Sequence, residues 1–287
     1  MMHRLVIVGV ILSLAILACG VNISLTDVPT ASPEAPESGH EVVEDIHVPA
    51  ASSGPSRLTI SFGGGSLRLG PGAAGLVDGT ATYDVASLKP EVITKGSEVE
   101  VKQRDVFGLV EPRNVKNSWD FTLGAMPLDL SVNAGAYQGA FEFGGLALTS
   151  LTVKDGAAQV DLSFSQPNKS EMTVFRYETG ASQVSMRGLA NANFTTMSMT
   201  SGAGQYTLDF SGDLKRDATI TISSGLSELT LIIPDGVPAT VTAETGLSDI
   251  SAGASWSKDG NRYTQSGTGP GLTIIIKGGA GKLTLTH

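Results

Sequence analysis

A short unit centred on a glycine recurs along this chain and constrains its fold more than any other feature. In its clearest copy, at Gly225, apolar residues stand five and three positions before the glycine and four and six positions after it. The same frame fits eight glycines, which are Gly63, Gly135, Gly156, Gly180, Gly202, Gly225, Gly246 and Gly279. At Gly135 the fourth position after the glycine is itself a glycine, Gly139.

The spacing of these copies predicts a repeat architecture. From Gly135 to Gly246, consecutive copies lie 21 to 24 residues apart, a period typical of stacked repeats. Alternation with period two on both sides of the glycine indicates strand, corner and strand, with alternate side chains buried. A glycine at a corner allows backbone angles that other residues avoid. One coil cannot bury its own apolar stripe, so the pattern predicts an all-β, single-stranded parallel β-solenoid.

Residues 57–134 fit the frame least well. After the Gly63 copy the next regular glycine is Gly135, and the interval holds a charged stretch and W-D-F-T-L at Trp119. We expect this region to form an irregular β cap on the solenoid repeats of residues 135–287, because an uncapped end is an exposed sheet edge. A second interruption, W-S-K-D-G-N-R-Y at Trp256, predicts a hairpin that covers the last coil.

The N-terminus has the features of a secretory signal. A basic residue, Arg4, precedes an apolar run of signal-peptide length that ends in I-L-A-C at Cys19, the sole cysteine. This resembles a lipobox, which predicts a signal peptide over residues 1–18 and a lipidated Cys19 as the membrane anchor, on the extracytoplasmic side. The alternative is an uncleaved anchor with an incidental cysteine. Residues 19–56, rich in proline, serine and glutamate, are predicted to form a disordered tether.

The composition excludes several kinds of catalytic and binding site from the folded part of the chain. The four histidines are residues 3, 40, 47 and 287, so histidine-based catalysis and histidine-ligated metal sites are not expected. The formal net charge of −9 disfavours nucleic-acid binding. The sequence predicts no cofactor and no catalytic residue.

Three weaker interpretations remain open. Asp209, Asp213 and Asp217 are spaced for a calcium-binding turn, although a solvated loop is the favoured explanation. The cations of Lys169, Arg176, Lys215 and Arg216 would suit a polysaccharide lyase, although charges at turns commonly protect strand edges. Trp119, Trp256 and Tyr263 fall outside the frame and would either stack on sugars or pack in the caps.

Several segments resemble a known family. W-D-F-T-L-G-A-M-P-L-D-L-S-V-N-A-G-A at Trp119, L-T-S-L-T-V-K-D-G-A-A at Leu148 and Y-T-L-D-F-S-G at Tyr206 are similar to bacterial toast-rack proteins. G-L-S-E-L-T-L-I-I-P-D-G-V at Gly225 resembles the extracytoplasmic domain of LiaF-like envelope-stress regulators and the adhesin-like solenoids. The resemblance implies an N-terminal toast-rack region followed by stacked coils, and it implies no catalytic residue.

Two functions from different classes follow. The first is a non-enzymatic binding or scaffold lipoprotein of the cell envelope, either adhesin-like or related to envelope stress, with an envelope polymer or protein as its partner. The alternative is a polysaccharide-active enzyme, a lyase or hydrolase, built on the solenoid.

Overall fold

The computed structural model describes residues 40–50, 55–103, 115–246 and 249–287. Residues 36–287 form one compact unit, and Cys19 with the predicted signal segment lies outside the described residues. The described part is almost entirely β, with two short 3₁₀ turns at Ala86–Leu88 and Leu189–Ala192. Its strands are β1 (Val42–Val48), β2 (Ser56–Pro71), β3 (Val77–Tyr83), β4 (Pro90–Lys95), β5 (Glu98–Gln103), β6 (Asn117–Leu123), β7 (Pro127–Glu142), β8 (Ala147–Ser163), β9 (Met172–Arg187), β10 (Phe194–Asp209), β11 (Ala218–Ile232), β12 (Ala239–Thr245), β13 (Asp249–Ala252), β14 (Ser257–Asp259), β15 (Arg262–Gln265) and β16 (Leu272–Thr286).

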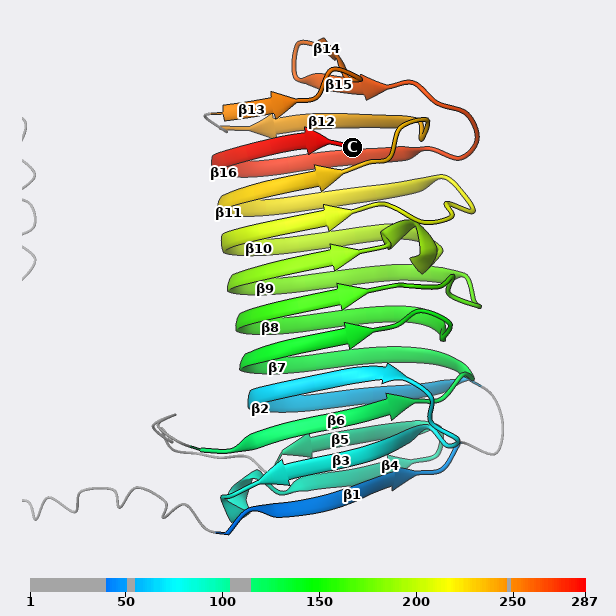
Figure 1. The fold of residues 1–287 in the computed structure, drawn as a ribbon, viewed down its shortest axis with the longest axis vertical. Coiled ribbons are helices and arrows are strands. Elements are labelled where there is room, and N and C mark those ends of the chain that lie inside the picture. Colours follow the sequence, from blue (N-terminus) through cyan, green and yellow to red (C-terminus); the bar gives the residue numbers. More distant parts are fainter. Residues whose placement is uncertain (1–39, 51–54, 104–114, 247–248) are drawn as a thin grey trace, which may run out of the picture. The chain divides into compact units, whose positions relative to one another are not determined.

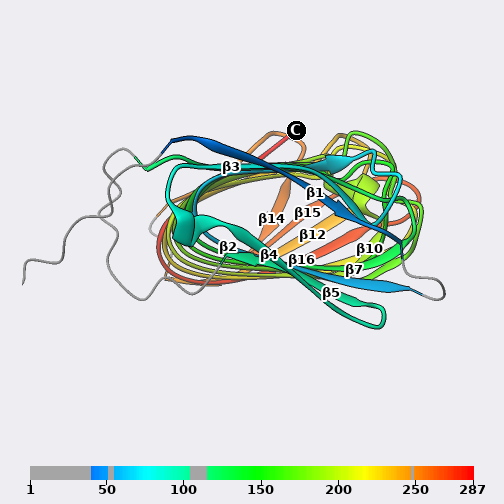
Figure 2. The same ribbon diagram turned by 90° about the horizontal axis from the view of Figure 1, so that it is seen from below.

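The long strands form the predicted parallel solenoid. β2, β7, β8, β9, β10, β11 and β16 stack as successive coils in parallel register (Figure 1). Each strand bends at its glycine, so a coil has a first limb before the corner and a second limb after it. Viewed along the stack, the coils superimpose as a flattened ring (Figure 2).

The eight corner glycines lie in one column, in the order 63, 135, 156, 180, 202, 225, 279 and 246. None of these eight glycines, all within the described ranges, has a left-handed φ. A special backbone angle is therefore not what requires glycine at these corners. The reason is close approach. A Cβ on Gly135 would lie 2.2 Å from the carbonyl oxygen of Gly63, and one on Gly180 would lie 2.4 Å from that of Gly156.

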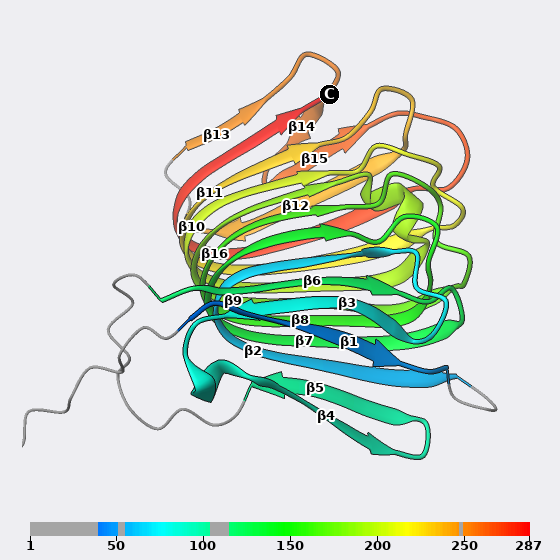
Figure 3. The same cartoon turned by 60° about the horizontal axis from the view of Figure 1, so that its bottom comes forward.

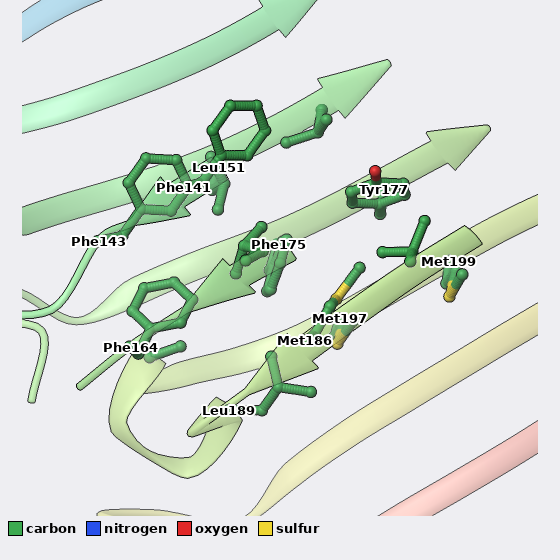
Figure 4. Packing of buried hydrophobic residues seen from close by; sticks show 14 of the residues in the cluster. Phe141, Phe143, Leu151, Phe164, Phe175, Tyr177, Met186, Leu189, Met197 and Met199 are labelled. Carbon is green, nitrogen blue, oxygen red and sulfur yellow. The ribbon is translucent and has the colours of Figure 1, made fainter. Parts of the chain in front are cut away.

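The frame positions build the core. Leu229 and Leu231 are 4% and 0% exposed, whereas Glu228 is exposed and Thr230 is half-buried, as the frame predicts. An aromatic ladder, which includes the frame residues Phe141 and Phe175, runs from the β7 coil to the β10 coil. The rings of Phe141, Phe143, Phe164, Phe175 and Phe194 follow one another with centroids 5.7 to 6.2 Å apart. Figure 4 labels the first four of them.

The order of the coils departs from the order of the sequence at the C-terminal end. β16 lies between β11 and β12, so Leu229 is paired with Leu283 rather than with residues of the Gly246 coil. The charges on the outer side are compatible with this order. In this order Lys282 stands between Glu228 and Asp249, whereas sequential stacking would place the two carboxylates opposite each other, which is destabilising.

A further coil, split in two, lies at the N-terminal end. β5 pairs with the first limb of β2 and β6 with the second limb. Val99, Val101, Trp119 and Phe121 therefore take the four frame positions opposite Leu58, Ile60, Leu67 and Leu69. Residues 104–114, which the structure does not describe, separate the two halves, so a search for an intact copy around one glycine misses this coil.

Both ends of the stack are capped by antiparallel strands. At the N-terminal end β3 pairs with β6, β1 pairs with β3, and β4 forms a hairpin with β5 (Figure 3). At the other end β14 and β15 form the predicted hairpin, and β15 pairs with β12. Gln265 anchors this hairpin by donating to the carbonyl oxygens of Pro234 and Val237 at 2.9 and 3.1 Å.

Two boundaries differ from those expected from the sequence. The predicted tether of residues 19–56 contains β1, whose Ile46 and Val48 are buried in the core. The tether prediction rested on proline content, but this stretch lacks proline and alternates apolar and polar residues. β2 also pairs directly with β7, so one core runs across the predicted boundary between residues 134 and 135.

Candidate binding surface

The histidines of the described residues lie at the surface, apart from one another. His40, His47 and His287 are exposed, and His47 pairs with Asp78 across β1 and β3. In the described ranges, no group of three or more His, Cys, Asp or Glu residues is placed to hold a metal ion.

The three aspartates considered for calcium serve separate contacts. Asp209 accepts a hydrogen bond from the backbone of Ser211 at 2.8 Å, and Asp213 pairs with Lys215. Asp217 accepts from the backbone N–H of Gly271, also at 2.8 Å, and so ties the β10–β11 turn to the segment before β16. Each carboxylate therefore holds a different part of the chain.

The cations considered for a lyase are also distributed. Arg216 pairs with Glu171 at 2.6 Å, and the nearest approach of Arg176 to a carboxylate is 3.9 Å, to Glu178. The first pair links the turn before β11 to the turn before β9, and the second lies within β9. Trp119 packs in the core of the split coil, whereas Trp256 and Tyr263 pack in the C-terminal cap. They are 0%, 9% and 2% exposed, so their rings do not form a sugar-stacking platform.

One polar cluster lies at the corner itself. Four hydroxyl groups converge on the carboxylate of Asp155. Tyr177 and Tyr137 donate to Oδ2 at 2.7 and 3.3 Å, while Thr179 and Ser182 donate to Oδ1. Burial and the nearby negative charge of Asp155 raise the pKa of the Tyr137 hydroxyl. Burial first, then the charges of Tyr137 and Asp155, raise that of Tyr177. The cluster is a satisfied internal network that joins β7, β8 and β9.

The second limb carries a continuous row of polar residues on its outer side. Each member stands at the third position after the corner or at the position paired with it, and together they cross nine strands. We call this set the polar row; it consists of Ser118, Ser66, Gln138, Gln159, Gln183, Gln205, Glu228, Lys282 and Asp249. The four glutamines, Glu228, Lys282 and Asp249 are all exposed.

A hollow opens at each end of the polar row. The first hollow, about 360 Å³, is lined by Ser66, Ser118, Gln138 and Gln159 of the row and by Arg68, Asp120, Ala140 and Asp161 beside it. It exists because Ala140, with its short side chain, stands in register between Arg68 and Asp161. A neighbouring depression of about 300 Å³ shares Arg68, Asp120, Ala140 and Asp161, and so widens this hollow along the strands.

The second hollow, about 400 Å³, lies at the C-terminal end of the polar row. It is lined by Gln205, Glu228, Lys282 and Asp249 of the row and by Leu226, Ser227, Gly204 and Gly281. Its depth comes from Gly204 and Gly281, which flank Ser227 in register. Leu226 at its rim is 63% exposed, the largest exposure among the described large hydrophobic residues.

The sequence contained a signal for this surface that the frame analysis did not use. Gln138, Gln159, Gln183 and Gln205 each stand three residues after a corner glycine. The predicted site residues included the corner glycines, which form a column three residues before the polar row along each strand. The other predicted site residue, Cys19, lies outside the described residues. No helix among the described residues is long and apolar enough to cross a membrane.

Three similar crystal structures are a candidate cell adhesion protein of Clostridium sporogenes and candidate adhesins of Bacteroides fragilis and Parabacteroides merdae. Their identities are 20%, 10% and 9%, with TM-scores of 0.49, 0.35 and 0.29. The alignments cover 86%, 85% and 85% of this chain and 98%, 96% and 97% of the others. No curated protein matches the chain significantly.

The family itself is established by sequence. Residues 37–185, just over half of the chain, match the family described as the N-terminal domain of toast_rack, DUF2154. The match begins close to β1 and ends within β9, so it includes the N-terminal cap and the first coils of the stack. The chain therefore belongs to the toast-rack family.

Proposed function

We propose that this protein is a lipid-anchored, extracytoplasmic binding solenoid that acts without a catalytic centre of its own. The observation that carries the proposal is the polar row, which presents exposed side chains in register along the stack and ends in a hollow on each side. A solenoid offers an extended, regular face for a polymer or a protein, and its rigidity limits the entropy lost on binding.

The anchor in this proposal is Cys19. The short apolar segment that ends in I-L-A-C supports its lipidation, and two or more acyl chains provide stable attachment. Residues between Cys19 and β1 would then space the solenoid from the membrane. In this arrangement the body meets its partner outside the cell while the anchor keeps it at the envelope.

Two measurements test the proposal. Cells that express the chain are fed an alkyne fatty acid, and label and membrane fractionation are compared with a Cys19→Ser variant. We expect the variant to lose both label and membrane association; a variant that keeps both would refute the anchor. The purified protein is also incubated with neutral and acidic polysaccharides. The appearance of new reducing or unsaturated ends, with turnover, would refute the non-enzymatic assignment.

A further inference from the structure

Most of the described glutamine side chains in the polar row do not take part in hydrogen bonds that would hold neighbouring strands together. Within the described part of the chain, the Gln205 amide donates to Glu228 Oε2 at 3.3 Å, whereas the side chains of Gln138, Gln159 and Gln183 make no hydrogen bond to the protein. Each amide carries two donors and an acceptor with two lone pairs. Three consecutive coils therefore present unused donors and acceptors at the spacing of neighbouring strands, about 4.8 Å.

We propose that the polar row binds an extended, neutral glycan chain that lies along the solenoid axis; this inference rests on the proposed binding function. The central stretch of four amides has no charge, so it has no electrostatic preference for a charged polymer, and the net charge of −9 disfavours polyanions. Sugar hydroxyls both donate and accept hydrogen bonds, which matches the amides in both directions.

The polar row, with a hollow at each end, orients the ligand along the stack and sets the length of glycan that it can contact. The row crosses eight strand spacings, about 38 Å at 4.8 Å each, so a chain of several sugars fits along it. At the first hollow, Arg68 pairs with Asp120 at 3.5 Å and Arg187 pairs with Asp161 at 3.3 Å, so these charges are largely offset and offer hydrogen bonds to hydroxyls. At the second hollow, exposed Leu226 provides an apolar contact for the C–H face of a sugar ring.

This arrangement predicts that each sugar of the glycan binds weakly and that the binding free energies of successive sugars add. Each sugar meets one or two amides and no exposed aromatic ring in the described row, so one unit binds weakly. A chain that contacts successive coils gains from every further unit, because the later contacts form within one complex. Affinity should therefore increase steeply with the number of sugars, and straight β-1,4-linked chains should bind better than curved ones.

The test uses the full chain, purified in detergent, and isothermal titration calorimetry. The probes are the neutral hexasaccharides cellohexaose and chitohexaose, the curved maltohexaose, the disaccharides cellobiose and chitobiose, and the polyanion heparin. We expect at least one straight hexasaccharide to bind about tenfold or more tightly than its disaccharide, as multivalent contact requires, and maltohexaose and heparin to bind less well.

Variants locate the site. Gln159→Ala/Gln183→Ala removes two central amides and should weaken hexasaccharide binding by about tenfold or more, because two hydrogen bonds are lost. The matched control is Thr219→Ala/Thr221→Ala, which removes two outward polar side chains from the first limb and should leave binding unchanged. Urea unfolding of both variants checks that the fold is retained.

Each outcome bears on the proposal. Equal binding of the hexasaccharide and the disaccharide, or equal weakening by both double variants, overturns a glycan site on the polar row. Absence of glycan binding, together with a protein or a charged polymer that the row variant no longer binds, overturns this inference and leaves the proposed binding function standing. If neither a glycan nor any other envelope component binds, both fail.

Discussion

Leu229 on β11 lies directly opposite Leu283 on β16, and not opposite a residue of the coil that follows it in sequence. The two side chains are 4% and 0% exposed, so the pair belongs to the continuous core. The C-terminal strand is thus an internal member of the stack. The Gly246 coil, which precedes it in the chain, lies beyond it.

Truncating Leu229 tests this pairing. Leu229→Ala should lower the free energy of unfolding by about 2–5 kcal/mol, through lost apolar burial and the cavity that remains. Combined with Leu283→Ala in a double-mutant cycle, it should show a coupling energy of about 0.5–3 kcal/mol. The measurement is urea unfolding. Leu229→Ala with Leu58→Ala, several coils away, should be additive, and Thr230→Ala should change stability by less than about 0.5 kcal/mol. Additivity of Leu229→Ala with Leu283→Ala would contradict the observed strand order.

The glycine column predicts opposite effects for two glycine-to-alanine changes. In Gly180→Ala the new Cβ would lie 2.4 Å from the carbonyl oxygen of Gly156, so we expect a loss of about 1–3 kcal/mol from overpacking. In Gly70→Ala the Cβ meets nothing within 4 Å, and the variant should gain about 0.4–1 kcal/mol through a less flexible unfolded state. Thermal unfolding of both proteins measures the difference. Similar effects at the two positions would show that close approach is not what selects glycine in the column.

The Asp155 network predicts a cost for losing one hydroxyl. Tyr177→Phe removes the 2.7 Å hydrogen bond to Asp155 and leaves a half-buried carboxylate with one donor fewer. We expect the free energy of unfolding at neutral pH to fall by about 1–3 kcal/mol. Tyr263→Phe, a buried tyrosine outside this network, is the control and should cost less. Chemical denaturation distinguishes the two, and equal losses would mean that the network adds nothing specific.

Alkaline pH should destabilise the protein through the same tyrosines. The pKa values of Tyr137 and Tyr177 are raised in the folded state from the ordinary value of 10.0, so unfolding favours loss of their protons. Their contribution is complete below pH 10 and is lost progressively as the pH rises above it. In Tyr137→Phe/Tyr177→Phe, the midpoint of urea unfolding should depend less on pH between about 9.5 and 11.5 than in the unaltered protein, since two ionisations are removed. Parallel pH profiles would exclude these residues as the cause.

A C-terminal truncation tests the inserted position of β16. Ending the chain at residue 271 removes a strand that pairs with β11, β12 and β13. We therefore expect rapid proteolysis of the β12–β15 region and loss of a single cooperative unfolding transition. A variant that lacks His287 alone, which lies after β16, is the control and should behave as the full chain does. Retention of cooperative unfolding by the long truncation would indicate that β16 is a peripheral strand.

Much of the coil structure was already determined by the sequence. Period-two alternation around glycines predicted the strands, the corners and the inward-facing positions such as Leu229, because side chains on a strand alternate between two faces. The D-G-N segment predicted the hairpin of β14 and β15 for a local reason, turn geometry. The glutamines three residues after the corners are likewise visible in the sequence.

Only the tertiary structure decided which coils are neighbours. The copies offer apolar residues at the same positions, so apolar periodicity alone cannot rank one stacking order above another. Long-range pairing settles it: β16 enters between β11 and β12, and β5 and β6 join β2 as a split coil. The polar row shows the consequence. Its glutamines come from successive repeats, but Lys282 stands between Glu228 and Asp249 because β16 lies between β11 and the Gly246 coil. Opposite charges in register are more favourable than the two carboxylates that sequential stacking would place opposite each other.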